Sequence, residues 1–198
     1  NSAGTNGSHT LGSVESISAG SETIGNSGTG NFTQTGGTNT VSNNLLVGAS
    51  SGSSGIYNVS GGSFSANNSY IGGSSVVSGG SGTMNISGAG DALISAALKL
   101  WDAGVVNLSG GMLKATSIDN TNGGTFNMTG GTLAVDTFTG NLAMTGGTLA
   151  PGNSPGLTSV FGDYSQDINS TLQMEIGGLL AGIEHDVLDV SGIMDLGG

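Results

Sequence analysis

The residues with the clearest catalytic potential in this sequence are its two histidines, His9 and His185. His185 lies between Glu184 and Asp186, and these residue types occur in metal sites and in Ser-His-Asp triads. Adjacent side chains on a strand point to opposite faces, so the three cannot converge without a special loop. No Gly-x-Ser-x-Gly nucleophile elbow accompanies them. We therefore expect no catalytic residues and no enzymatic activity.

Acidic residues offer a second kind of chemistry, because carboxylate oxygens are ligands that Ca²⁺ prefers. Seven of the 13 acidic residues follow Pro151, and the calcium candidates among them are Asp163, Asp167, Asp186 and Asp189. The Gly-Gly-x-Gly-x-Asp nonapeptide of calcium-binding β-rolls and the EF-hand loop are both missing. A solvated acidic face is therefore favoured over a calcium site, and we expect neither a bound metal nor a cofactor.

The charge of the chain disfavours several classes of partner. The formal net charge is −11, and Lys99 and Lys114 are the only lysine or arginine residues. Nucleic acids and anionic membrane surfaces attract basic patches, so neither is an expected partner. No apolar run is long enough to span a bilayer as a helix, so direct membrane insertion is not expected. The chain has no cysteine and therefore no disulfide.

An internal repeat indicates the fold class. A decapeptide of the form Gly-x-apolar-Asn-apolar-Ser/Thr-Gly-Gly-x-apolar has clear copies that begin at Gly55, Gly104, Gly124 and Gly140, and weaker copies at Gly30 and Gly82. A second marker, an apolar residue followed by Gly, recurs with a similar period at Ile24, Val47 and Ile71. The spacing is that of one turn of a β-helix. We therefore predict an all-β, single-stranded parallel β-helix (a β-solenoid) of about eight or nine rungs, with little or no helix.

Alternation within the decapeptide predicts which side chains enter the core. Apolar residues flank a polar one, as in a half-buried strand, and the expected inward set is Tyr57, Val59, Met84, Ile86, Val106, Leu108, Phe126, Met128, Leu142 and Met144. The polar positions between them are expected to face outward as a structural ladder of stacked amides, formed by Asn58, Asn85, Asn107 and Asn127. The Gly-Gly pair that follows can supply the positive φ of a sharp corner.

The organisation of the chain changes near residue 150. Residues 1–150 carry the decapeptides, whereas residues 151–198 lack them and are richer in acids. We expect the second segment to add acidic β-rungs to the same solenoid. Within the first segment, residues 91–101 (DALISAALKLW) could form a helical turn, and an irregular strand is favoured there.

Further motifs accompany the decapeptides: GTLAPGNSPG at 147–156, GDYSQ at 162–166, STLQMEI at 170–176 and DVLDVSG at 186–192. With these motifs, nearly the whole chain resembles a family of very large exported bacterial proteins. The family carries autotransporter-associated β-strand repeats or related Gly-rich repeats of the PEP-CTERM-associated type. The resemblance implies a β-solenoid on an exported protein and no particular activity.

The function we expect is that of a non-enzymatic extracellular scaffold, a building block of cell-surface or matrix material. Solenoid ends present unpaired strand edges, and such edges pair with other chains unless they are capped. Self-association along the axis is therefore expected, through residues 2–18 at one end and 187–196 at the other. The chain opens with neither the basic nor the apolar region of a signal peptide, so export would require a segment that has been removed.

Two alternatives stay open. The first is an adhesin-type passenger module that binds glycans or other surface proteins, and a wide exposed aromatic strip would favour it. The second is a β-helix carbohydrate-active enzyme, which a groove of acids and aromatics would favour. The outward strand positions of the decapeptides hold Asn, Thr, Ser or Ala and no acid, which disfavours the enzyme.

Overall fold

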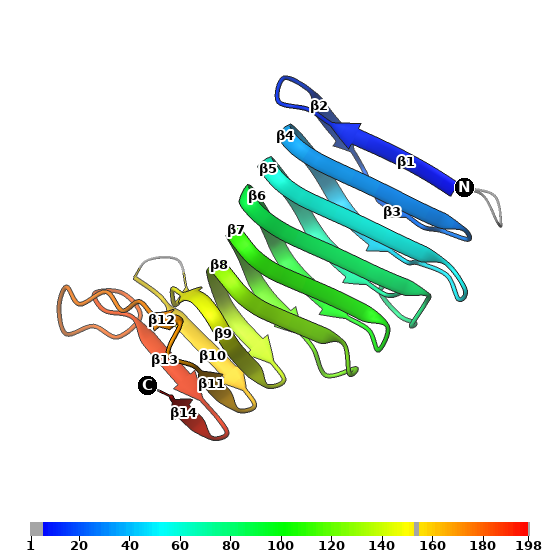
Figure 1. Cartoon of the computed structure of the whole chain (residues 1–198). Coiled ribbons are helices and arrows are strands. Elements are labelled where there is room, and N and C mark those ends of the chain that lie inside the picture. The colour runs from blue at the N-terminus through cyan, green and yellow to red at the C-terminus, as the bar shows by residue number, and fades with distance from the viewer. Residues whose placement is uncertain (1–5, 153–154, 198) are drawn as a thin grey trace.

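The chain winds into an elongated stack of parallel strands whose two ends lie far apart (Figure 1). A computed structural model describes residues 6–152 and 155–197, which form a parallel β-solenoid of about seven turns without a helix. The predicted fold class is confirmed. About seven turns are formed where eight or nine were expected, and residues 173–186 contribute no strand to the stack.

Each turn has three faces. Five long strands each contribute to all three: β4 (Thr29–Val47), β5 (Ser54–Ile71), β6 (Ser81–Leu100), β7 (Gly104–Asp119) and β8 (Thr125–Thr139). At the N-terminal end the faces are separate strands that pair with successive segments of β4, namely β1 (Asn6–Leu11), β2 (Ser16–Ala19) and β3 (Glu22–Ile24). We call the faces that begin with β1, β2 and β3 the first, second and third face.

The C-terminal part continues the three faces with shorter strands. They are β9 (Leu142–Leu149), β10 (Leu157–Phe161), β11 (Tyr164–Gln166), β12 (Ser170–Leu172), β13 (Val187–Val190) and β14 (Met194–Leu196). Residues 173–186 leave the stack between β12 and β13, and we call this loop the C-terminal lobe. The segment 91–101 forms no helix: β6 is continuous to Leu100, with register shifts before Asp91 and before Ala97.

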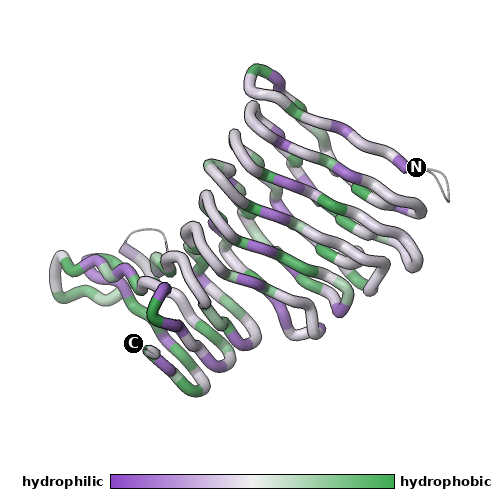
Figure 2. Tube along the Cα trace, in the orientation of Figure 1, coloured by the Kyte–Doolittle hydropathy of each residue, from purple (hydrophilic) through white to green (hydrophobic). Residues whose placement is uncertain are grey.

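One apolar core runs along the axis, because alternate residues of all three faces point inward. Hydrophobic and polar residues accordingly alternate along the strands (Figure 2). Nine of the ten predicted core residues are buried, and Phe126 is the exception. Strand β8 pairs with β9 only from Met128 onward, so the next turn leaves the Phe126 ring half-covered. The ring packs edge-on against Phe138, with the centroids 5.4 Å apart.

The Gly-Gly pairs form the corner between the first and second faces. The second glycine has a positive φ in each pair, for example 75° at Gly62 and 66° at Gly111. A Cβ atom added to Gly62 would also overlap the backbone of Gly36 and Gly37 in the preceding turn. A side chain is therefore excluded twice, by the dihedral angle and by the neighbouring turn.

Candidate functional site

The acid-histidine-acid trio at 184–186 lies in the C-terminal lobe, where its side chains bind separate parts of the backbone. The Glu184 carboxylate accepts hydrogen bonds from the N–H groups of Leu179 and Leu180, at 2.9 and 3.0 Å. Nδ1 of His185 lies 3.0 Å from the carbonyl oxygen of Gly178. These contacts stabilise the fold of the lobe. Because the side chains bind different backbone groups, they do not converge on one substrate or metal.

Asp186 is the buried member of the trio, with 6% of its surface exposed. Its Oδ1 accepts a hydrogen bond from the N–H of Gly156 at 2.8 Å, and its Oδ2 accepts one from the N–H of Glu175 at 2.7 Å. Each oxygen therefore has a backbone donor. The carboxylate joins the loop before β10 to the start of the C-terminal lobe.

The other three calcium candidates are spread along the C-terminal strands. Asp163 accepts a hydrogen bond from the N–H of Ile193 at 2.8 Å, and Asp167 accepts one from the N–H of Asn169 at 2.8 Å. Asp189 is exposed on β13. Within residues 6–152 and 155–197, no three His, Cys, Asp or Glu side chains gather as a metal-ligand set.

A chelator is therefore expected to have little effect on stability. Adding EDTA should lower the melting temperature by no more than about 3 °C, because the described residues form no metal-ligand set whose occupation would stabilise the folded state. Thermal unfolding followed by circular dichroism, with and without excess CaCl₂, checks this. A drop of about 10 °C or more would restore the calcium hypothesis, with Asp163, Asp167, Asp186 and Asp189 as the first residues to substitute.

A column of asparagines runs up the outside of the first face. Asn58, Asn85, Asn107 and Asn127 pair in register from turn to turn. Each Nδ2 donates to the Oδ1 of the preceding turn, at 2.7 Å for Asn85 to Asn58 and at 2.8 Å for the two later links. In the preceding turn the column position is held by Thr33, and Nδ2 of Asn58 donates both to its Oγ1 and to Oδ1 of Asn31, each at 3.3 Å. The contact with Asn31, two residues before the ladder position, could not be predicted from the repeat.

The ladder predicts unequal costs for its interior and its end. Asn85→Ala removes two side-chain hydrogen bonds and Asn127→Ala removes one, at about 0.5–1.5 kcal/mol each. We expect the free energy of unfolding, measured by urea denaturation, to fall roughly twice as far for Asn85→Ala. Equal losses for the two variants would show that the amide contacts do not stabilise the stack.

The single tryptophan lies on the third face, and its ring is already engaged. Its Nε1–H donates to the carbonyl oxygen of Ser74 at 2.8 Å, and Nζ of Lys99 lies 4.4 Å from the ring centroid. Lys99 also forms a 3.3 Å ion pair with Asp119. Burial opposes ionisation of Asp119, but hydrogen bonds from Thr121 and Lys99 outweigh it and hold the pKa of Asp119 below its ordinary value. Trp101 thus fastens the loop 73–79, and Lys99 lies over its ring.

A groove lies between the second face and the C-terminal lobe. Its volume is about 310 Å³, and its polar lining includes Lys114, Thr132, Gln173 and Glu175. Asp186 also borders it, although both of its oxygens already accept backbone hydrogen bonds. Hydrogen-bonding groups of both polarities face this groove, and no aromatic residue does.

Unpaired strand edges occupy both ends of the solenoid. In the part of the chain that the structure describes, β1, β2 and β3 pair only with β4, and β12, β13 and β14 pair only with β9, β10 and β11. The N–H groups of Val187 and Ser191 donate toward β10. Alternation along the strand therefore directs the N–H groups of Leu188 and Val190 to the free edge. Residues 2–5 of the expected N-terminal edge lie outside the described residues.

Comparison with known proteins adds no relative to these observations. The chain matches no protein-family model, no curated protein and no solved structure. Across residues 6–152 and 155–197, no helix is long and apolar enough to cross a lipid bilayer.

Proposed function

We propose that this chain is a non-enzymatic structural element of an exported bacterial surface or matrix protein, and that it associates end to end along the solenoid axis. The observation that carries the proposal is the pair of unpaired edges, which have the same three faces and the same parallel direction. A subunit can add to such an edge as each turn adds to the one before it, because the template strands are already ordered. The resemblance of the repeat motifs to those of exported bacterial solenoids supports the location.

The outer surface supports a scaffold more than a recognition module. Most aromatic side chains are in the core: Phe32, Tyr57, Phe64, Phe138 and Tyr164 are all buried. The first face instead displays an amide ladder that stiffens the stack. Because only 8% of residues are charged, repulsion between subunits is weak, although the net charge of −11 opposes association at low salt.

The proposal predicts self-association that strengthens as salt is added. Light scattering of the purified chain should show larger assemblies at about 0.5 M NaCl than at 0.02 M, since salt screens the like charges. Leu188→Pro removes an N–H group that faces the free edge of β13, so it should block association without unfolding the inner turns. Leu188→Ala is the matched control, because it loses the same side chain and keeps the N–H group.

Two outcomes would count against the proposal. A wild-type chain that stays monomeric at high concentration and high salt does not assemble through its ends. Equal association of Leu188→Pro and Leu188→Ala would place the contact somewhere other than the β13 edge.

A second candidate function is an adhesin-type module that binds a glycan, and the groove beside the C-terminal lobe favours it. Lys114, Gln173 and Glu175 can supply the donors and acceptors that hydroxyl groups require. Binding of the wild-type chain to a glycan array, lost in Gln173→Ala and kept in Asn127→Ala on another face, would support this function. The groove gives little support to the third alternative, a carbohydrate-active enzyme. Asp186 borders the groove, but both of its oxygens already accept hydrogen bonds from backbone N–H groups.

A further inference from the structure

Glycines stack at one corner of every turn, including the first and the last. Gly7, Gly30 and Gly55 pair in register, and Gly82 and Gly104 continue the column. At the other end, Gly192 lies two residues before Met194, which pairs with Tyr164, and its N–H donates to the carbonyl oxygen of Gly162. The corner that joins consecutive turns is therefore present at both ends of the molecule.

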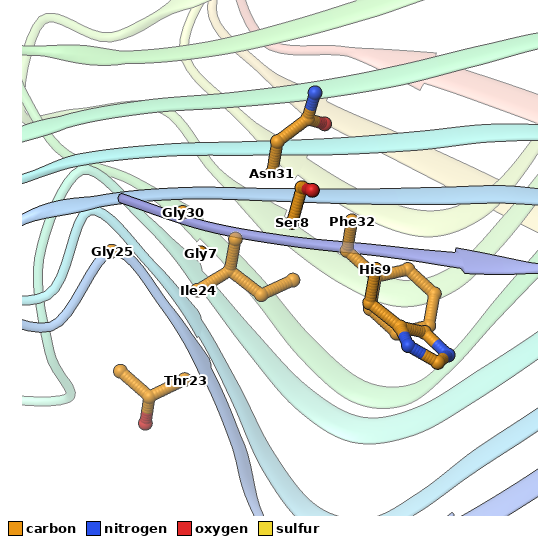
Figure 3. Close-up of a pocket in the computed structure, with 9 residues that line it drawn as sticks. All are labelled: Gly7, Ser8, His9, Thr23, Ile24, Gly25, Gly30, Asn31 and Phe32. Atoms are coloured by element: carbon orange, nitrogen blue, oxygen red, sulfur yellow. The ribbon is translucent and has the colours of Figure 1, made fainter. Parts of the chain in front are cut away.

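In the part of the chain that the structure describes, this corner is open at the N-terminal end. A pocket of about 220 Å³ lies between β1 and β3, and Gly7, Ile24, Gly25 and Gly30 are part of its lining (Figure 3). Within the stack the same corner is closed by backbone: a Cβ atom added to Gly55 would overlap Ile24 and Gly48. The open corner thus has the shape that receives a glycine of another turn.

The inward residues of the first turn are unusual because two of them are ionisable. Glu22 heads a column of the third face that continues through Leu45, Ser69, Leu98, Ile118, Phe138, Val160 and Val190. His9 heads a column of the first face, where its ring lies 5.2 Å from that of Phe32 (Figure 3). At every inner turn the Glu22 column is buried, and only Ser69 among those residues is polar.

Glu22 is held by a polar cluster at this end of the core. Nδ2 of Asn39 donates to Oε2 of Glu22 at 3.0 Å and to the hydroxyl of Tyr57 at 3.0 Å. The Tyr57 hydroxyl donates to Oε1 of Gln34 at 2.9 Å. The described residues supply no donor to Oδ1 of Asn39, which is buried. A protonated Glu22 carboxyl group has an O–H donor, which is what this oxygen lacks. The hydrogen-bonding groups of the cluster are therefore compatible with neutral Glu22.

The ionisable groups that face Glu22 are His9 on β1 and Tyr57 on β5. Burial raises the pKa of Glu22 above its ordinary value of 4.5, while the hydrogen bond from Asn39 and the charge of His9 lower it in part. Burial also raises the pKa of Tyr57 well above its ordinary value, so this hydroxyl stays neutral. Glu22 therefore gains a proton at a higher pH than an ordinary glutamate does.

The opposite end of the molecule is apolar. Leu172, Leu188 and Val190 are half-buried against the core, and Met194 and Leu196 are 43% and 55% exposed. If a second copy continues the register, its Val190 stacks on Glu22 and its Met194 stacks on His9. An ionised carboxylate would then be enclosed by apolar side chains without a cationic partner from the arriving turn, which is strongly unfavourable.

We propose that the N-terminal turn is the docking face for the C-terminal turn of a second copy, and that Glu22 controls its use. The ionised carboxylate weakens the docking of another subunit at this end, and the neutral carboxyl group strengthens it. Inward-pointing charge on an edge strand is a known means by which proteins prevent edge-to-edge pairing. This inference rests on the end-to-end association proposed above, and it assigns the contact a polarity and a residue that regulates it.

The experiment is sedimentation velocity of the full chain from pH 7.5 to pH 4.5 at constant ionic strength. The proteins compared are wild type, Glu22→Gln and Glu22→Leu. Leucine is chosen because Leu45 holds the same column position in the next turn. At pH 7.5 both variants should associate at least about tenfold more tightly than wild type, because no charge is buried. The affinity of wild type should approach that of the variants as the pH falls. Any pH dependence of the affinity that remains in Glu22→Gln comes from the other acidic residues, which all three proteins share.

His9→Phe separates the two ionisable groups of the first turn. It repeats the residue type of Phe32 and removes the charge that helps to keep Glu22 ionised, so the pH at which wild-type association rises should shift upward. Circular dichroism of each variant checks that the solenoid is folded. If wild type associates and both Glu22 variants bind no more tightly, the control by Glu22 is wrong while end-to-end association stands. If no variant associates at any pH, both proposals fail.

Discussion

Replacing Ile86 with Asp is expected to unfold the solenoid or bring it to the margin of stability. Ile86 is fully buried on β6, and each neighbouring turn places an apolar residue beside it, Val59 on one side and Leu108 on the other. An unpaired charge at such a position costs several kcal/mol, and a domain of this size is stable by only about 5–15 kcal/mol. Urea denaturation followed by circular dichroism measures the loss.

Two other aspartate variants calibrate this result. Phe126→Asp should cost less than Ile86→Asp, because the Phe126 ring is only half-buried and water can reach the new carboxylate. Thr83→Asp, at an outward position of the same strand as Ile86, should change the free energy of unfolding by no more than about 1 kcal/mol. Similar losses at Thr83 and Ile86 would contradict the assignment of inward and outward positions.

Gly62→Ala is also expected to lower the free energy of unfolding strongly, and Gly52→Ala is the matched control. The two glycines have nearly the same dihedral angle, with φ of 75° and 77°. A methyl group at Gly62 would overlap the backbone of Gly36 and Gly37, whereas one at Gly52 meets nothing within 4 Å. Gly52→Ala should therefore cost only the roughly 1–2 kcal/mol of a left-handed residue, and Gly62→Ala about 1–3 kcal/mol more.

The difference between these variants isolates the contact between turns from backbone strain. Thermal or urea unfolding of both proteins under the same conditions gives the two free energies. If Gly52→Ala and Gly62→Ala lose equal stability, the corner glycines are required only for their dihedral angle. The overlap of a methyl group at Gly62 with the preceding turn would then not be destabilising.

The repeat made much of this structure predictable. Because each decapeptide places apolar, Asn and Gly residues at fixed positions, their columns follow once the turns stack in register, as they do for Asn85 and Asn107. Phe126 departs from the pattern because its exposure depends on where β9 begins to pair with β8, which no single decapeptide specifies.

The polar cluster at the N-terminal end could not be found from alternation. Gln34 and Asn39 are polar, and the repeat treats polar positions as outward, yet both are buried beside the hydroxyl of Tyr57. Glu22 belongs to the first turn, where no decapeptide copy marks the inward positions. Its place in a core column appears only when β3 is paired with β4.

Negative-stain electron microscopy of the purified chain at high salt and at about pH 5 tests the central claim most directly, because these conditions screen charge and favour neutral Glu22. End-to-end association through the terminal edges predicts unbranched filaments one solenoid wide, since a head-to-tail contact that does not close into a ring propagates without limit. Filaments should be absent from Leu188→Pro under the same conditions. Single rods of uniform length from the wild-type protein would contradict the account.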